Sequence, residues 1–159
     1  GSGLIGYIVV NVLLYITVGI EEELMFRSVV TECVLRKNSN IIVFASVYSG
    51  LLFGLAHITN FIFDADMTMF NKWCTMIMAC VFGFTLAVIF LRTKSIGAVI
   101  TLHFLWDFAD FMNHMMIVER YRYGGSYNAL ALQIPVLIVM FVIAVFCMYN
   151  KRQMRLQSV

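Results

Sequence analysis

The sequence has few charged residues and almost no proline. Charged residues make up 13% of its 159 positions and one residue is a proline, whereas 62% are hydrophobic. Soluble globular domains are about one-quarter charged and about one-half apolar, so the composition indicates an integral membrane protein. The formal net charge of +2 is small, and basic residues do not alternate with aromatic ones. We therefore expect no nucleic-acid partner.

Several familiar motifs are also absent. The chain has no H-E-x-x-H pair and no C-x-x-C pair, and its four cysteines are scattered. We interpret them as reduced, packed side chains and not as a disulfide or zinc framework. We find no internal repeat and no linker, so residues 4–159 are expected to form a single membrane-embedded domain. Residues 1–3, Gly-Ser-Gly, are interpreted as a cloning remnant. The cysteines are Cys33, Cys74, Cys80 and Cys147.

Long apolar segments are abundant. A helix needs about 20 mostly apolar residues to cross a bilayer, and backbone groups in lipid must be paired within a helix or a closed barrel. The apolar runs are too continuous for the alternating strands of a barrel. We therefore predict an all-α integral membrane protein with about five transmembrane helices around a polar intramembrane cavity. The predicted segments are residues 4–35, 40–58, 71–91, 96–118 and 129–149.

Basic residues are distributed unequally between the ends of these segments. Seven follow the first, third and fifth segments, and three lie at the opposite ends. The positive-inside rule places the richer side in the cytoplasm. We therefore expect a cytoplasmic C-terminus. As a separate expectation, we place the protein in the bacterial cell membrane. The richer side carries Arg36, Lys37, Arg92, Lys94, Lys151, Arg152 and Arg155, and the other carries Lys72, Arg120 and Arg122.

Three clusters of ionisable residues interrupt the apolar segments. Such residues cost about 2.5–3.5 kcal/mol each at the centre of a membrane helix, so they are candidates for function. The first cluster is Glu21-Glu22-Glu23 followed by Arg27. Glu23 and Arg27 are four residues apart and lie about 40° apart on a helix, so they can form an ion pair. The alternative is an interfacial edge between two shorter helices.

The second cluster is His57, four residues after Phe53 and near the end of the second segment. A single histidine in this position also suits packing or an interface. Gly50, Gly54 and Ala56 are small and would let a neighbouring helix approach closely. A tight helix interface is therefore as consistent with this segment as a catalytic site.

The third cluster lies in the fourth segment. His103 and Asp107 are four positions apart, and Asp110 and His114 continue the same helix face. A membrane helix with four ionisable groups on one face must direct that face into protein or into a water-filled cavity. The alternatives to a catalytic site are a structural polar seam and a proton path.

The three clusters together resemble the signatures of one known family, in order and in spacing. The chain contains Glu22-Glu23-x-x-x-Arg27, Phe53-x-x-x-His57 and His103-x-x-x-Asp107. These are similar to the motifs of the CPBP family, the CAAX-protease and bacteriocin-processing membrane proteins that are also called Abi proteins. The last position differs, since many members carry Asn where this chain has an Asp. The resemblance implies a helical membrane fold and peptidase activity on prenylated CAAX proteins, bacteriocins or pheromone precursors.

Peptide hydrolysis needs an activated water, a stabiliser for the oxyanion and a proton for the leaving amine. No Ser–His or Cys–His pair is evident, but a carboxylate and an imidazole could share one water. We expect Glu22 to act as general base, with His57 orienting the water and His103 stabilising the oxyanion. Asp107 would position His103, or donate a hydrogen bond if it is protonated. These roles require Glu22, His57 and His103 to converge within about 8 Å.

Other readings remain open. Glu23, Arg27 and Phe53 are expected to support the site. We expect no cofactor; the rival chemistry is zinc held by Glu22, His57 and His103 with an open fourth position. The expected partners are a peptide or lipidated protein substrate and membrane lipids. A non-catalytic immunity or scaffold protein is the alternative from another functional class.

Overall fold

The computed structural model describes residues 2–31, 42–63, 65, 68–122 and 130–149. Within these ranges every secondary-structure element is a helix, which confirms the all-α prediction. The elements run in the order α1 (Ser2–Glu23), the π-helix η1 (Leu24–Thr31), α3 (Ile42–Ala56), α4 (Thr59–Phe63), α5 (Met69–Thr93), α6 (Ile96–Arg122) and α7 (Leu130–Tyr149).

Three helical segments of the described chain are long and apolar enough to cross a membrane. They are Gly3–Val29, Val43–Phe63 and Met69–Thr93, and a shorter apolar helix spans Ile134–Cys147. The chain is therefore a helical integral membrane protein, while the count of five crossings stays a prediction. Residues Cys33, Arg36, Lys37, Lys151, Arg152 and Arg155, and the side chains of His114, Arg120 and Arg122, lie outside the described part of the chain.

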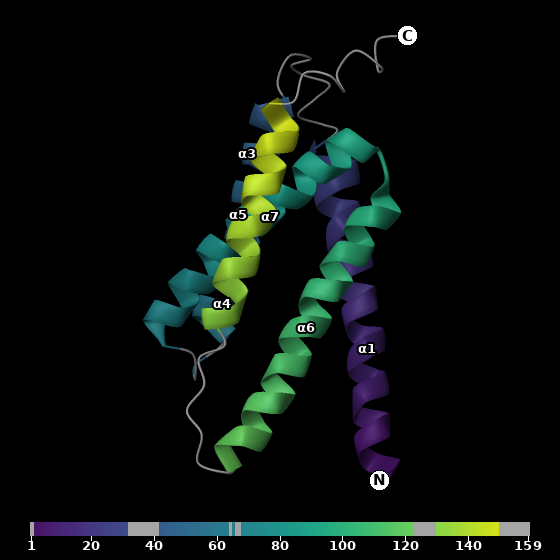
Figure 1. The fold of residues 1–159 in the computed structure, drawn as a ribbon, viewed down its shortest axis with the longest axis vertical. Helices are drawn as coiled ribbons and strands as arrows, with labels where there is room; N and C mark the ends of the chain where they lie inside the picture. The colour runs from purple at the N-terminus through teal and green to yellow at the C-terminus, as the bar shows by residue number, and fades with distance from the viewer. Residues whose placement is uncertain (1, 32–41, 64, 66–67, 123–129, 150–159) are drawn as a thin grey trace.

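The helices pack in two connected groups. Helix α5 contacts both α3 and α7, while α1 packs against α6. In Figure 1, α1 and α6 run side by side, and α5 leads into α6 through a short connection. The π-helix η1 continues α1 and contacts α3, α5 and α6, so it lies where the two groups meet.

The connection between α5 and α6 is short because both helix ends are capped locally. Lys94 adopts a left-handed conformation with φ of 54°, and its N–H donates to the carbonyl of Phe90 at 2.7 Å. This is a common way to end a helix. The hydroxyl oxygen of Ser95 then accepts from the N–H of Ala98 at 3.2 Å and caps the start of α6. The chain thereby changes direction between α5 and α6 (Figure 1).

Glycines explain the close approach of α3 to α5. A Cβ atom on Gly50 would lie 2.7 Å from the carbonyl oxygen of Cys80, and one on Gly54 would lie 2.9 Å from that of Met76. Both distances are too short for a side chain, so the backbones meet only because these positions lack one. The tight interface that the sequence offered as an alternative for this segment is observed at the two glycines, whereas Ala56 is exposed.

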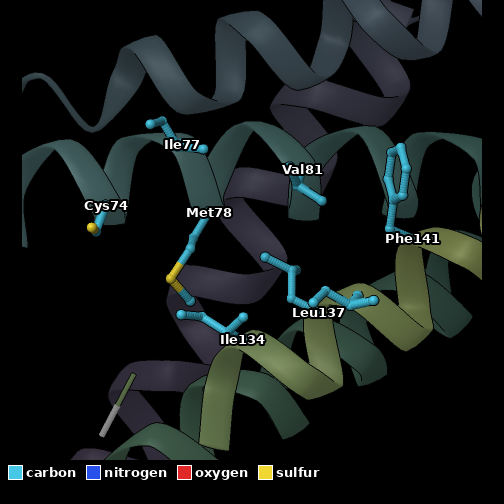
Figure 2. Close-up of a pocket in the computed structure, with 8 residues that line it drawn as sticks. Cys74, Ile77, Met78, Val81, Ile134, Leu137 and Phe141 are labelled. Carbon is cyan, nitrogen blue, oxygen red and sulfur yellow. The ribbon is translucent and has the colours of Figure 1, made fainter. Parts of the chain in front are cut away.

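The other face of α5 forms an apolar groove with α7. Its volume is about 360 Å³ (Figure 2). The described cysteines, Cys74, Cys80 and Cys147, are free thiols. Cys74 lines the groove, whereas Cys147 is exposed, so the packed position predicted for the cysteines is wrong for Cys147. None of the groove residues belongs to the three ionisable clusters. The groove is lined by Cys74, Ile77, Met78, Val81, Ile134, Leu137, Ile138 and Phe141.

Candidate active site

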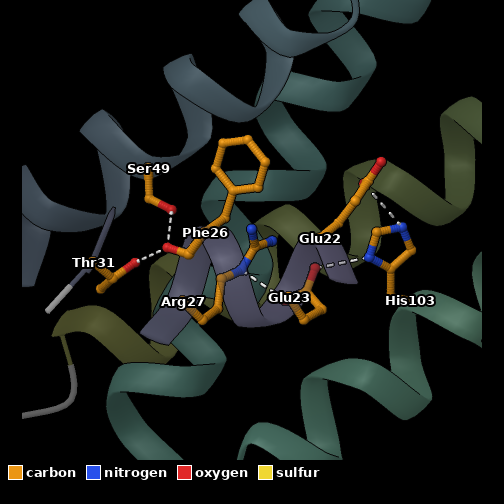
Figure 3. A network of polar contacts seen from close by, with 7 residues as sticks. All are labelled: Glu22, Glu23, Phe26, Arg27, Thr31, Ser49 and His103. Atoms are coloured by element: carbon orange, nitrogen blue, oxygen red, sulfur yellow. Dashed lines mark hydrogen bonds and ion pairs between the residues drawn. The ribbon is translucent and has the colours of Figure 1, made fainter. Parts of the chain in front are cut away.

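The acidic cluster lies where α1 passes into the π-helix η1. A π-helix is rare and frequently marks a functional site. Here the carbonyl oxygen of Phe26 accepts from the hydroxyl of Thr31 at 2.7 Å and from the hydroxyl of Ser49 at 3.4 Å (Figure 3). Because Ser49 belongs to α3, these contacts tie η1 to α3 within one turn of the glutamates. Neither contact was anticipated from the sequence, which has no local signal for a π-helix.

Helix α1 approaches α6 closely one turn before these glutamates. A Cβ atom on Gly19 would lie 3.7 Å from the carbonyl oxygen of Ile100 and 3.8 Å from the Cβ of His103. These are ordinary contact distances, so α1 and α6 lie in direct contact at this position without strain. Glu22 and Glu23, three and four residues later, can therefore reach the His103 ring. Sequence reasoning missed Gly19, since the contact between α1 and α6 has no signal within either helix.

Glu23 is fully buried and contacts two basic groups. Its Oε2 atom lies 2.8 Å from Nε of Arg27, and its Oε1 atom lies 2.8 Å from Nδ1 of His103 (Figure 3). The side chains of Glu23 and Arg27 are both 0% exposed. The Arg27 contact is an ion pair without hydrogen-bond geometry, whereas the His103 contact is a hydrogen bond. The ion pair predicted from spacing is confirmed; the contact with His103 spans 80 residues and was not foreseen.

The second ring nitrogen of His103 faces two further carboxylates. Its Nε2 atom lies 3.7 Å from Oε2 of Glu22 and 3.5 Å from Oδ2 of Asp107. The His103 side chain is 4% exposed, while those of Glu22 and Asp107 are 34% and 21% exposed. The imidazole is thus buried, and both carboxylates lie on its more open side. Separations of this length suit groups that share a water molecule.

The hydrogen bond to Glu23 determines how His103 can act. Because a carboxylate accepts and does not donate, the Nδ1 atom of His103 carries the proton of this bond. The Nε2 atom then holds a lone pair in the neutral ring and an N–H in the imidazolium. Glu23 therefore fixes which nitrogen is presented to Glu22 and Asp107.

Phe53 links the second cluster to the other two. Its ring centroid lies 5.2 Å from that of His57 and 5.8 Å from that of His103. The Cζ atom of Arg27 lies 5.0 Å from the same centroid, a cation–π contact. A Cβ atom on Gly83 would lie 2.7 Å from the Cβ of Phe53, so α5 leaves the space that this side chain occupies. Phe53, expected only to support the site, is its central apolar contact.

His57 lies in the turn that follows α3 and is half-buried. Its Nδ1 atom lies 3.0 Å from the carbonyl oxygen of Phe53. When Nδ1 carries the proton and donates to that carbonyl, Nε2 is free to accept. The predicted convergence within 8 Å is observed for Glu22 and His103, while the contact that joins His57 to them runs through Phe53. The catalytic roles of all these residues stay predictions.

The rival zinc reading requires three donors that point at one position. Among the described residues, no group of three or more His, Cys, Asp or Glu side chains is arranged to hold a metal ion. The Nδ1 atoms of His57 and His103 already contact a backbone carbonyl and Glu23. Both contacts leave the Nε2 atom of each ring available, so zinc held by Glu22, His57 and His103 stays the rival prediction.

Comparison with known proteins adds one match. The sequence model of a family described as type II CAAX prenyl endopeptidase Rce1-like matches residues 4–109. This range contains the first two clusters and, of the third, His103 and Asp107. No match is found among curated proteins or among solved structures.

Proposed function

The chain belongs to the Rce1-like family of type II CAAX prenyl endopeptidases, and we propose that it is an intramembrane endopeptidase whose water nucleophile is activated by Glu22. The proposed substrate is a membrane-associated peptide or protein, such as a prenylated CAAX protein or a bacteriocin or pheromone precursor. Family membership supports the peptidase activity in general. The glutamate-dependent mechanism and these substrates are our proposal.

The observation that carries the mechanism is the difference between two consecutive glutamates. A general base must reach its proton directly or through one water. The Glu22 carboxylate is 34% exposed and lies 3.7 Å from Nε2 of His103, so a water can contact both. The Glu23 carboxylate is 0% exposed and already contacts Arg27 and His103. Glu22 is therefore the better base, and Glu23 positions the imidazole.

The proposed reaction follows from these positions. Glu22 takes a proton from the water, and the water oxygen attacks the carbonyl carbon of the scissile peptide bond. The electron pair of the carbonyl moves to its oxygen, which Nε2–H of imidazolium His103 stabilises. Asp107 holds the His103 ring at Nε2, and Glu23 holds it at Nδ1. The electron pair of the oxyanion then re-forms the carbonyl as the carbon–nitrogen bond breaks, and Glu22 returns the proton to the leaving amine. The products are a carboxylic acid and an amine. His57 is proposed to orient the water.

Purified protein and mass-spectrometric product mapping test this function. The substrates are membrane-tethered peptides, with and without a prenylated cysteine near the C-terminus. Glu22→Gln keeps the size of the side chain but cannot accept a proton, so we expect cleavage to fall by roughly 10²–10⁴-fold. Glu21→Gln is the matched control, because Glu21 is the exposed neighbour in the same acidic run. It should retain cleavage.

Three results would contradict parts of the proposal. Full cleavage by Glu22→Gln would show that another group is the base. Loss of wild-type cleavage on adding chelator, with recovery on adding zinc, would replace the metal-free reaction with the zinc reading. Absence of cleavage of every peptide by folded wild-type protein would favour the non-catalytic immunity or scaffold role.

A further inference from the structure

Lys72 is a buried lysine in the first turn of α5, and it joins this helix to α4. The residue is only 7% exposed. Its Nζ atom donates to the carbonyl oxygen of Phe61 at 3.3 Å, and the same ammonium lies 6.0 Å from the centroid of the Phe61 ring. A positive charge is unfavourable in the first turn of a helix, because this end of the helix dipole is itself positive. The stability of α5 alone therefore does not explain a lysine at this position.

Helix α4 depends on Phe61 for its packing among the described residues. It is five residues long, and so short a helix is not stable by itself. Its Ile62 and Phe63 side chains are 71% and 81% exposed. Phe61 is half-buried, and its ring packs edge-on against that of Trp73 of α5 at 5.0 Å. The contacts of Phe61 with Lys72 and Trp73 therefore fasten α4 to α5.

The turn that carries His57 lies directly between α3 and α4. The N–H of His57 donates to the carbonyl of Gly54 at 3.1 Å. The next bond runs from the N–H of Ile58 to the carbonyl of Leu55 at 3.0 Å, and the following one from Phe61 back to Ile58 at 2.9 Å. A continuous run of hydrogen bonds thus connects the end of α3 to α4. The position of α4 therefore constrains the backbone that holds the His57 ring.

We propose that Lys72 is a positioning residue, which fixes His57 by holding α4 against α5. The inference rests on the proposed function, in which His57 orients the attacking water. The Nδ1 atom of His57 lies 3.0 Å from the carbonyl oxygen of Phe53, which leaves Nε2 to contact a water. Release of α4 would loosen the turn and this hydrogen bond. A displacement of about 1 Å in a catalytic group can cost on the order of 10²-fold in rate.

The kinetics of Lys72→Met protein test this inference. Methionine keeps much of the length and apolar contact of the side chain but cannot donate to Phe61. We expect kcat to fall by about 10- to 100-fold with little change in KM, because His57 is proposed to contact the water and not the peptide. Lys94→Met is the matched control and should cleave like the wild type, since Lys94 is exposed at the other end of α5. An unchanged kcat in folded Lys72→Met protein would overturn the inference.

Two further substitutions of Lys72 distinguish its hydrogen bond from simple filling of space. Lys72→Arg keeps a positive charge and N–H donors that reach the carbonyl of Phe61, so it should recover most of the wild-type kcat. Lys72→Gln stays polar but is one bond shorter, so it should be as slow as Lys72→Met and replaces that variant if the methionine protein does not fold. A Lys72→Arg protein as slow as Lys72→Met would overturn the inference, because its donors would not have restored the position of His57.

A spectroscopic measurement separates failure of this inference from failure of the proposed function. Nitrogen NMR of histidine-labelled protein, recorded where the ring is neutral, reports which nitrogen of His57 carries the proton; the His57 signals are those lost in His57→Gln protein. The wild type and Lys94→Met should show one form, protonated at Nδ1, whereas Lys72→Met should show a mixture of both neutral forms. This mixture supports the inference even when no peptide is cleaved. A single form in Lys72→Met, identical to that of the wild type, overturns it.

Discussion

Replacing Glu23 by glutamine removes the charge that holds two buried basic groups while keeping the shape of the side chain. The carboxylate lies 2.8 Å from Nε of Arg27 and 2.8 Å from Nδ1 of His103, and the side chains of Glu23 and Arg27 are fully buried. The amide oxygen of glutamine can still accept from His103. It cannot neutralise Arg27, which is left as an uncompensated buried charge. Breaking a buried pair in this way costs about 3–5 kcal/mol.

Thermal unfolding in detergent measures this loss. A chain of this length shifts its midpoint by about 2–4 °C per kcal/mol, so Glu23→Gln should unfold roughly 6–20 °C below the wild type. Tryptophan fluorescence is a suitable signal, because the Trp106 ring lies 5.0 Å from that of Phe82 beside the site. Glu21→Gln is the control, and its midpoint should stay within about 2 °C of the wild type, since surface changes have small effects.

Two outcomes would refute this reasoning. Equal midpoints for Glu23→Gln and Glu21→Gln would mean that the buried pair does not stabilise the fold. The double variant Glu23→Gln/Arg27→Met should recover much of the lost stability, because replacing both members of a buried pair is often neutral. A double variant no more stable than Glu23→Gln would show that the cost does not come from the unpaired guanidinium.

Two further substitutions test the site and the packing that supports it. Asp107→Asn should keep cleavage within about tenfold of the wild type, since an amide can still hold Nε2 of His103. An inactive Asp107→Asn variant together with an active Glu22→Gln variant would mean that the roles assigned to Asp107 and Glu22 are reversed. Gly50→Ala should lower the midpoint of thermal unfolding, because overpacking costs about 1–3 kcal/mol. Gly97→Ala is the control, since a Cβ atom there would have no neighbour within 4 Å. Similar unfolding midpoints for the two variants would contradict the close contact between α3 and α5.

The contacts that could be predicted from the sequence are those within one helix. Residues four apart share a helix face, so the Glu23–Arg27 pair and the approach of Asp107 to His103 follow from spacing alone. The all-α fold likewise follows from apolar run length, although the predicted number of crossings does not. Three segments of the described chain are long and apolar enough to cross a membrane, and the count of five stays a prediction.

The contacts that could not be predicted join different helices or depend on an irregular backbone. Which carboxylate holds His103 is decided by how closely α1 approaches α6 at Gly19, and spacing within either helix contains no information on this. The bonds from Thr31 and Ser49 to the Phe26 carbonyl depend on η1 being a π-helix. The motif could identify Phe53, but only its ring contacts in the folded chain show that it lies between two imidazoles and a guanidinium.

Consecutive glutamates are useful in this site because of the helix rotation between them. Neighbouring residues on a helix point about 100° apart, so one can face the protein interior while the next faces an opening. Here Glu23 contacts Nδ1 of His103 from the buried side and Glu22 faces Nε2 from the more exposed side. One imidazole is thereby held between two carboxylates with different access to water. A shift of Glu22 and Glu23 by one position along α1 would turn both carboxylates about 100° around the helix. Neither ring nitrogen of His103 would then keep its carboxylate partner.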